Sequence, residues 1–194
     1  MHTITGQKNN EIEPLADELV FRLQKKQYQV SRENEKIYAD NQVFLLNTGH
    51  REFMQNETGD YLLPAEFGAE VLTAFILHIL QKHEKMYHEA VSFVHSIGIR
   101  PNLYGYRFLI AAICLGMKNS DSLYSVTETI YPAVASLYHV DTRCVERNIR
   151  NAVNDAYKND PERLRKPFYY KVEKPYDSEL IALAIDAIHY KNNY

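Results

Sequence analysis

Side chains that can form paired hydrogen bonds with nucleic-acid bases are concentrated between residues 141 and 158. Arginine can donate two hydrogen bonds to guanine O6 and N7, asparagine can pair in the same way with adenine, and glutamate can accept from cytosine N4. The candidates of these types are Arg143, Glu146, Arg147, Arg150 and Asn154. The sequence contains no recognisable phosphate-binding glycine loop or nucleophile–base–acid motif, so we expect no catalytic residues and no enzyme.

The same segment has the apolar spacing of an amphipathic helix from residue 142 to about 158. At about 100° per residue, five apolar residues form one stripe. They are Val145, Ile149, Ala152, Val153 and Ala156. The opposite side carries Arg143, Arg147, Arg150 and Asn154, and Glu146 lies at the border. One face is expected to pack and the other to carry base-reading groups. The plainer alternative is a solvated helix whose outer face is basic.

A short helix and a tight turn are predicted before this helix. Pro132 begins a two-turn helix that ends at Tyr138, and His139 and Val140 form the turn. Asp141 can cap the next helix by accepting hydrogen bonds from its first backbone N–H groups. A short helix, a tight turn and a longer helix are the layout of a helix-turn-helix. Tyr131 precedes a proline and is therefore expected outside the helical region.

The rest of the C-terminal half is also predicted to be helical. Helices are expected over residues 87–97, closed by Gly98, and over residues 104–117. Ser125 to Glu128 has the pattern of a capping box, which predicts a short helix that ends near Ile130. The expected fold class is therefore mainly α. Residues 86–194 should form a helical bundle that contains the helix-turn-helix.

The N-terminal half, residues 1–85, is predicted to be a small helical or α+β region. Residues 1–10 are polar and expected to be disordered, and a helix is expected over residues 11–26. Asp40 and Asn41 separate two short apolar runs, which predicts a hairpin. Pro64 is interpreted as a first-turn proline of a helix over residues 65–84. The apolar stripe of that helix is expected to be core, with a dimer seam as the alternative.

Charge and composition divide the chain into two parts. Residues 1–89 hold 9 basic and 14 acidic side chains, a net charge of −5, whereas residues 90–194 hold 13 and 11, a net charge of +2. This asymmetry indicates two functional units. The sequence has no run of about 18 apolar residues, so no membrane span is predicted. The N-terminus lacks the pattern of a secretory signal. We therefore expect a cytoplasmic protein with no membrane partner.

Metal and thiol chemistry are not expected. The chain has two cysteines, Cys114 and Cys144, without the spacing of a disulfide framework or a zinc site. His78, His83 and His88 are spaced by five residues and do not stack on one helix face. We therefore expect no metal and no cofactor. Cys144 is interpreted as a small apolar residue near the turn, with a redox-sensitive thiol as the alternative.

Several short motifs recur in the order and at nearly the spacing of one known family. They are Ile97-Gly98-Ile99 with Gly105-Tyr106, Ser125-Val126-Thr127 with Ile130-Tyr131-Pro132, Val145-Glu146-Arg147 with Ile149-Arg150, and Lys174-Pro175 with Ser178-Glu179-Leu180-Ile181-Ala182. Over residues 97–188 the chain resembles the C-terminal DNA-binding effector domain of the sporulation initiation response regulator (stage 0 sporulation protein A). The resemblance implies a six-helix fold around a helix-turn-helix that recognises a short promoter box.

The resemblance also implies roles for individual residues. Glu146, Arg147 and Arg150 occupy base-reading positions, and Arg143 and Asn151 occupy positions near the DNA backbone or the groove edge. Neighbours such as Asn148 and Asn154 differ from the family, so the DNA box itself stays open. The family's phosphorylatable receiver is not expected, because residues 1–85 show no alternating pattern of strands and helices.

We therefore expect a sequence-specific regulator of transcription that binds double-stranded DNA and belongs to a sporulation-related lineage. The alternative is a protein-interaction or anti-regulator module that has lost DNA binding. A homodimer would raise affinity because one recognition helix reads only a few base pairs. Residues 1–85 would then serve oligomerisation or signal input. Basic residues between 160 and 174 could either add phosphate contacts or belong to a solvated loop. They are Arg163, Arg165, Lys166 and Lys171.

Overall fold

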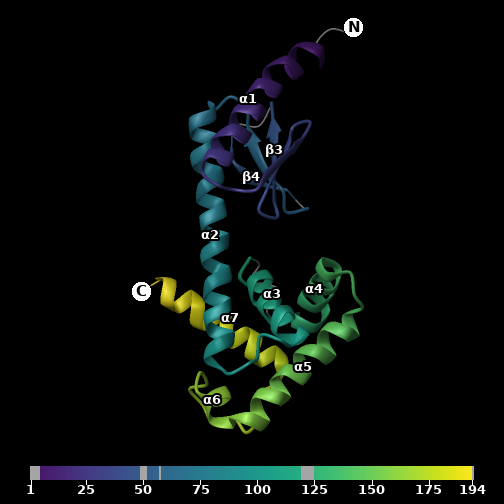
Figure 1. The fold of residues 1–194 in the computed structure, drawn as a ribbon, viewed down its shortest axis with the longest axis vertical. Helices are drawn as coiled ribbons and strands as arrows, with labels where there is room; N and C mark the ends of the chain where they lie inside the picture. Colours follow the sequence, from purple (N-terminus) through teal and green to yellow (C-terminus); the bar gives the residue numbers. More distant parts are fainter. Residues whose placement is uncertain (1–4, 49–51, 57, 119–124, 194) are drawn as a thin grey trace. The chain divides into compact units, whose positions relative to one another are not determined.

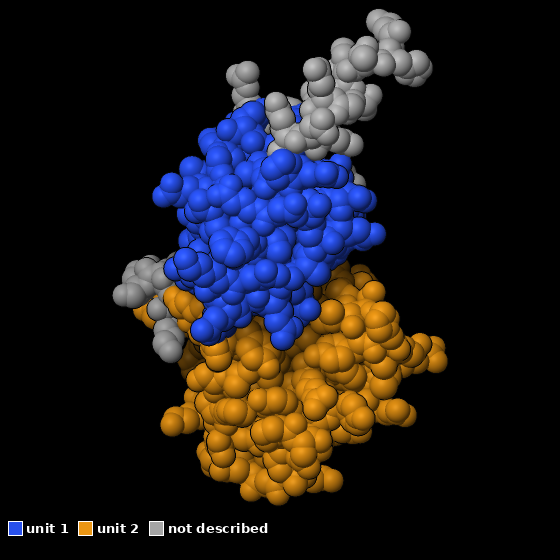
Figure 2. Space-filling view, turned by 45° about the horizontal axis from the view of Figure 1, so that its top comes forward, with its two compact units in different colours: residues 1–84 blue, residues 85–194 orange. Residues whose placement is uncertain are grey.

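The computed structural model describes residues 5–48, 52–56, 58–118 and 125–193. The chain divides into two compact units, residues 1–84 and residues 85–194, which Figure 2 shows in different colours. Among the described residues, no helix is both long enough and apolar enough to cross a membrane. Each unit has a hydrophobic core of its own.

The first unit is an α+β structure. It begins with α1 (Thr5–Lys25) and continues with β1 (Val30–Glu33), β2 (Lys36–Ala39), β3 (Gln42–Asn47), β4 (Met54–Gln55) and β5 (Tyr61–Pro64). The strands form one sheet in the order β1-β2-β3-β5-β4, in which only the β3–β5 pair is parallel. Residues from α1, from the sheet and from the first half of α2 (Ala69–Ser96) share one core (Figure 1). This topology differs from the doubly wound parallel sheet of a receiver.

The predicted hairpin is confirmed. Strands β2 and β3 are antiparallel, and the pairing of Ala39 with Gln42 leaves two residues in the loop. Asp40 and Asn41 have φ values of 44° and 65°. Two successive residues with positive φ form the turn that matches the twist of a two-residue hairpin, and Asp and Asn tolerate this conformation. Ile37 and Phe44 face each other across the pair, and both are fully buried.

Three predictions for the first unit are wrong. The α1 helix begins at Thr5, within the segment expected to be disordered. Pro64 ends β5 rather than beginning a helix. Pro64 lies opposite Asn47 at the end of the β3–β5 pair. A proline has no N–H to donate to a neighbouring strand, and this loss is tolerated best at the end of a strand. The two helices expected over residues 65–84 and 87–97 form one helix, α2, because no glycine or proline interrupts the polar stretch between them.

The second unit is helical, which confirms the expectation of a mainly α fold. Besides the last turns of α2, it contains α3 (Tyr104–Lys118), a π-helical turn η2 (Val126–Ile130), α4 (Tyr131–Tyr138), α5 (Thr142–Asn159), α6 (Pro161–Arg165) and α7 (Asp177–Asn193). These elements share one core, and its largest fully buried side chains include Ile97, Leu109, Ile113, Ile130 and Tyr131. As expected, Gly98 follows the end of α2 with a φ of 82°.

The entry into α4 differs from the prediction in two ways. Tyr131 is helical, with φ −63° and ψ −42°, and its N–H bonds to the carbonyl of Val126 five residues earlier. A proline ring would collide with the carbonyl four residues before it in a regular helix, and the wider π turn relieves that collision at Pro132. The predicted capping box does not form. The Ser125 hydroxyl donates to the Glu128 carboxylate (2.9 Å), and the Ser125 side chain accepts no hydrogen bond from a backbone N–H.

Candidate nucleic-acid interface

The α4 and α5 helices are joined by a short turn that local hydrogen bonds define. His139 lies in the left-handed region (φ 54°, ψ 45°), and its N–H bonds to the carbonyls of Ala135 and Ser136. The N–H of Val140 also bonds to the Ala135 carbonyl (3.0 Å). The Asp141 carboxylate then accepts from the N–H of Arg143 (2.7 Å), so the predicted cap of α5 is confirmed. These bonds satisfy the backbone groups left free where one helix ends and the next begins.

The apolar stripe of α5 is buried as predicted. Its members are at most 2% exposed: Val145, Ile149, Ala152, Val153 and Ala156. The first turn of α3 approaches this helix closely at Gly105. A Cβ atom at Gly105 would lie 2.7 Å from the Ala152 Cβ and even closer to the carbonyl oxygen of Asn148. The absence of a side chain at Gly105 therefore lets α3 hold α5 in place, with its opposite face turned outward.

Two arginines of the outer face are free for an external partner. Arg143 and Arg147 are exposed, and neither guanidinium has a hydrogen-bond or ion-pair partner among the described residues. Together with neighbouring side chains they line a hollow of about 560 Å³ at the start of α5, formed by Asp141, Arg143, Cys144, Glu146, Arg147 and Arg150. Unpaired guanidinium groups at the start of a helix suit an anionic partner that presents paired acceptors.

Arg150 lies beside these two arginines but is paired within the protein. Its Nη2 donates to the Glu146 carboxylate, and its Nε lies 3.7 Å from Oδ2 of Asp177, the first residue of α7. The side chain of Asp177 is only 13% exposed. Burial raises the pKa of this carboxyl, while Arg150 acts in the opposite direction. The sequence analysis did not predict Asp177 as a partner of Arg150, because no pattern near residue 150 indicates a contact with a residue 27 positions later.

The two candidate asparagines have different surroundings. Asn151 is exposed on α5. Asn154 was expected on the exposed basic face, but it is half-buried, and its Oδ1 is enclosed without a hydrogen-bond partner among the described residues. The helical wheel gives the direction of a side chain but does not show which neighbouring elements cover it. Asn154 stays a proposed DNA contact, which the affinity of an Asn154→Ala variant for a duplex would test.

Comparison with known protein families agrees with this geometry. The family model described as sporulation initiation factor Spo0A C terminal matches residues 90–188. The chain belongs to this family. The match extends from the last turns of α2 into α7 and includes the α4–α5 pair. The Spo0A C-terminal family comprises DNA-binding regulatory domains of sporulation response regulators rather than enzymes. No receiver domain is indicated, and the matched region begins after the first unit.

Two basic residues beyond α5 have structural roles in this member of the Spo0A C-terminal family. Arg163 of α6 donates to the carbonyls of His95 (2.6 Å) and Ser96 (3.0 Å) at the end of α2. Arg165 donates to the carbonyl of Glu173 (2.7 Å) and lies over the ring of Tyr157. A basic side chain at a helix C-terminus satisfies free carbonyls and interacts favourably with the helix dipole. Arg163 and Arg165 are thus committed to the protein's own backbone.

Arg163→Gln is expected to lower the free energy of unfolding by about 1 kcal/mol through the loss of these hydrogen bonds. The salt dependence of DNA binding should stay unchanged, because the wild-type guanidinium makes no phosphate contact in this arrangement. Urea denaturation and a salt series of DNA affinity measure the two effects. Lys166→Gln is the matched control, because Lys166 is exposed on the same segment. A shallower salt slope with unchanged stability in Arg163→Gln would contradict the structural role.

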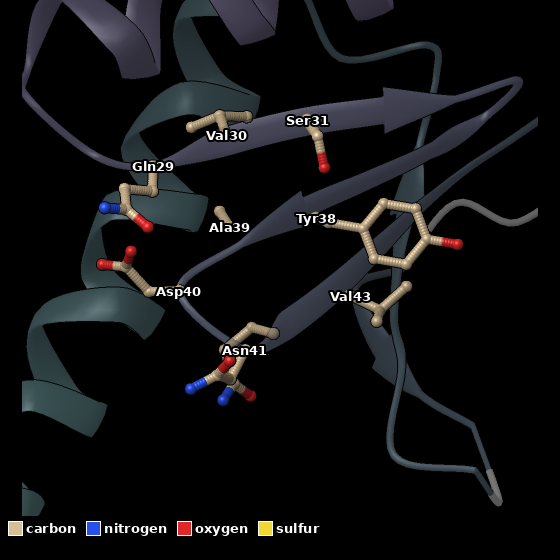
Figure 3. Close-up of a pocket in the computed structure, with 9 residues that line it drawn as sticks. Gln29, Val30, Ser31, Tyr38, Ala39, Asp40, Asn41 and Val43 are labelled. Atoms are coloured by element: carbon tan, nitrogen blue, oxygen red, sulfur yellow. The ribbon is translucent and has the colours of Figure 1, made fainter.

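The first unit carries a hollow of its own, beside the β2–β3 turn. Figure 3 shows side chains around it from the strands β1, β2 and β3, such as Tyr38, and from the turn, Asp40 and Asn41. Gln29, Asp40 and Asn41 are exposed, so this is an open surface depression. Its lining does not identify a ligand. Among the described residues there is likewise no group of three or more His, Cys, Asp or Glu side chains that could hold a metal ion.

Proposed function

We propose that this protein is a sequence-specific regulator of transcription that binds double-stranded DNA through its second unit. In this proposal α4 and α5 act as a helix-turn-helix, and α5 enters the major groove. Residues 1–84 serve oligomerisation or signal input. The protein works in sporulation or a related programme, as its family does.

One observation carries the proposal: α5 buries all five apolar residues of its stripe and leaves Arg143 and Arg147 exposed and unpaired within the described structure. If these guanidinium groups served only to keep the helix surface solvated, their position along the helix would not matter. Here both lie in the first half of α5, next to a tight turn, where the N-terminal part of a recognition helix contacts base edges. The same two residues weaken the alternative of a module that has lost DNA binding.

Each candidate residue has a proposed role. Arg147 reads guanine through two parallel hydrogen bonds, and Glu146 and Arg150 contact the neighbouring base pair. Arg143 and Asn151 contact phosphates or the groove edge and set the register of the helix on the duplex. A single helix reads only a few base pairs, so we also propose that two copies bind neighbouring sites.

Fluorescence anisotropy with the full chain tests the proposal. The first probe is a labelled duplex that carries the promoter box of the family, and the second is a scrambled duplex of the same composition. Affinities are measured from about 50 to 200 mM salt, because phosphate contacts alone can change affinity by orders of magnitude over this range. A selection from a duplex library with a randomised centre identifies the preferred site if the box differs.

Selective binding to one duplex, with weaker and strongly salt-dependent binding to the scramble, is the expected result. Two copies per duplex in a stoichiometric titration would support the dimer. Equal affinity for every duplex would contradict sequence-specific recognition. An absence of binding at low salt would contradict DNA binding altogether and favour the protein-interaction module.

A further inference from the structure

Asp177 stands out because it joins two helices that the proposed function treats separately. It is the first residue of α7, and its carboxylate lies 3.7 Å from Nε of Arg150 on α5. Both helices belong to the second unit, and in Figure 1 the start of α7 lies beside α5. Glu146 pairs with Nη2 of the same guanidinium from one turn earlier on α5. Two carboxylates from different elements therefore face one arginine.

The geometry leaves the outer edge of Arg150 available. A guanidinium has five N–H donors. Nε lies 3.7 Å from the Asp177 carboxylate and one N–H of Nη2 bonds to Glu146, so among the described residues both N–H groups of Nη1 and the second one of Nη2 remain. Two of these are sufficient for the O6 and N7 atoms of guanine. The side chain of Arg150 is 55% exposed, in keeping with an accessible outer edge.

The Asp177 carboxyl is largely removed from solvent. Its side chain is 13% exposed, and desolvation by burial raises its pKa above the ordinary value of an aspartate despite the nearby Arg150. A carboxyl whose pKa is raised in the folded state binds its proton more tightly there than in the unfolded chain. Its contribution to stability therefore falls as the pH rises through the pKa of the folded state.

We propose that Asp177 is a positioning residue that sets the orientation of the Arg150 guanidinium for base recognition. Asp177 attracts the Nε side of the guanidinium from α7, while Glu146 accepts a hydrogen bond from Nη2 on α5, so the two carboxylates together favour one orientation of the side chain. A restrained arginine loses less conformational entropy on binding a base than a free one does. The inference rests on the proposed function and adds a residue outside α5 to the determinants of specificity.

Asp177→Asn tests this inference, because it removes the charge and keeps the shape. Affinities are measured by anisotropy for the preferred duplex and for variants in which each G·C pair is replaced in turn. Arg150→Met first identifies the base pair that Arg150 reads, as the pair at which discrimination is lost. Asp186→Asn is the matched control, since Asp186 is an exposed carboxylate on the same helix. Asp177→Ser repeats the test in case the asparagine variant does not fold.

Asp177→Asn should reduce discrimination at that one base pair by about threefold or more, as for other contacting pairs of residues. Affinity for the scrambled duplex should not fall, because a negative charge has been removed. Urea denaturation at pH 7 should show that Asp177→Asn still unfolds cooperatively, so that a change in discrimination is not caused by unfolding. In the Arg150→Met background the Asp177 substitution should have no further effect, and Asp186→Asn should behave like the wild type.

The outcomes separate the two proposals. Wild-type discrimination retained in folded Asp177→Asn and Asp177→Ser would overturn the positioning role and leave the proposed function intact. An equal loss of discrimination in the Arg150→Met background would also overturn it, because Asp177 would then act through another group. Absence of any discrimination by the wild-type protein would overturn the proposed function, and the positioning role with it.

Discussion

Arg147→Ala is expected to reduce affinity for the preferred duplex by about 5- to 150-fold, the contribution of one bidentate contact to a base pair. The fold should not change, because Arg147 is exposed and its guanidinium has no partner among the described residues. Affinity for a scrambled duplex should fall much less. Anisotropy with both duplexes and with base-pair variants measures the effect and identifies the base that is read.

Arg147→Lys is the matched control for charge. Lysine keeps the positive charge but lacks the planar fork that bonds two acceptors at once. Arg147→Lys should therefore lose most of the discrimination and keep the salt dependence of the wild type. If both variants discriminate as well as the wild-type protein, Arg147 does not read a base, and the reading face of α5 has to be assigned to other residues.

Gly105→Ala is expected to lower the free energy of unfolding of the second unit by about 3 kcal/mol, near the upper end for overpacking a core. The new Cβ would lie 2.7 Å from the Ala152 Cβ and would overlap the carbonyl oxygen of Asn148. The nearest obstacle is backbone of α5, which cannot rotate away as a side chain can. The two helices would have to separate. Urea denaturation followed by circular dichroism measures the loss.

Gly68→Ala is the control for this substitution. No heavy atom lies within 4 Å of a Cβ at Gly68, and its φ is outside the left-handed region. The free energy of unfolding should then change by less than about 1 kcal/mol, with any gain coming from reduced freedom of the unfolded chain. Equal denaturation midpoints for Gly105→Ala and the wild type would show that α3 and α5 do not pack as closely as described.

The sequence by itself determined the features that depend on neighbouring residues. The apolar stripe of α5 follows from helical periodicity. The Asp141 cap follows from the short distance along the chain between this side chain and the Arg143 N–H, which donates a hydrogen bond to it. The β2–β3 hairpin follows from Asp40 and Asn41, which adopt positive φ without large strain. The family match over residues 90–188 also agrees with the short motifs, because their order and spacing are specific in combination.

The local motifs were less reliable where two rules competed. Pro64 satisfies the preference for the first turn of a helix and also the preference for the end of a strand, and pairing with β3 decided between them. Tyr131 was expected outside the helix because it precedes a proline. The π turn before it provides an alternative that keeps the backbone helical. No local pattern distinguishes these outcomes.

Only the tertiary structure decided which polar groups of the site are free. Arg143, Arg147 and Arg150 look equivalent on a helical wheel, yet Arg150 meets Asp177, which the chain brings back from 27 residues away. From the sequence, Arg163 could be a phosphate contact or part of a solvated loop, but in the fold it caps α2, whose last carbonyls lie 67 and 68 residues earlier in the chain. Asn154 points outward on the wheel and is half-buried in the fold. The physical reason is the same in each case: periodicity determines the direction of a side chain, whereas its partners come from elements distant in sequence that pack beside it.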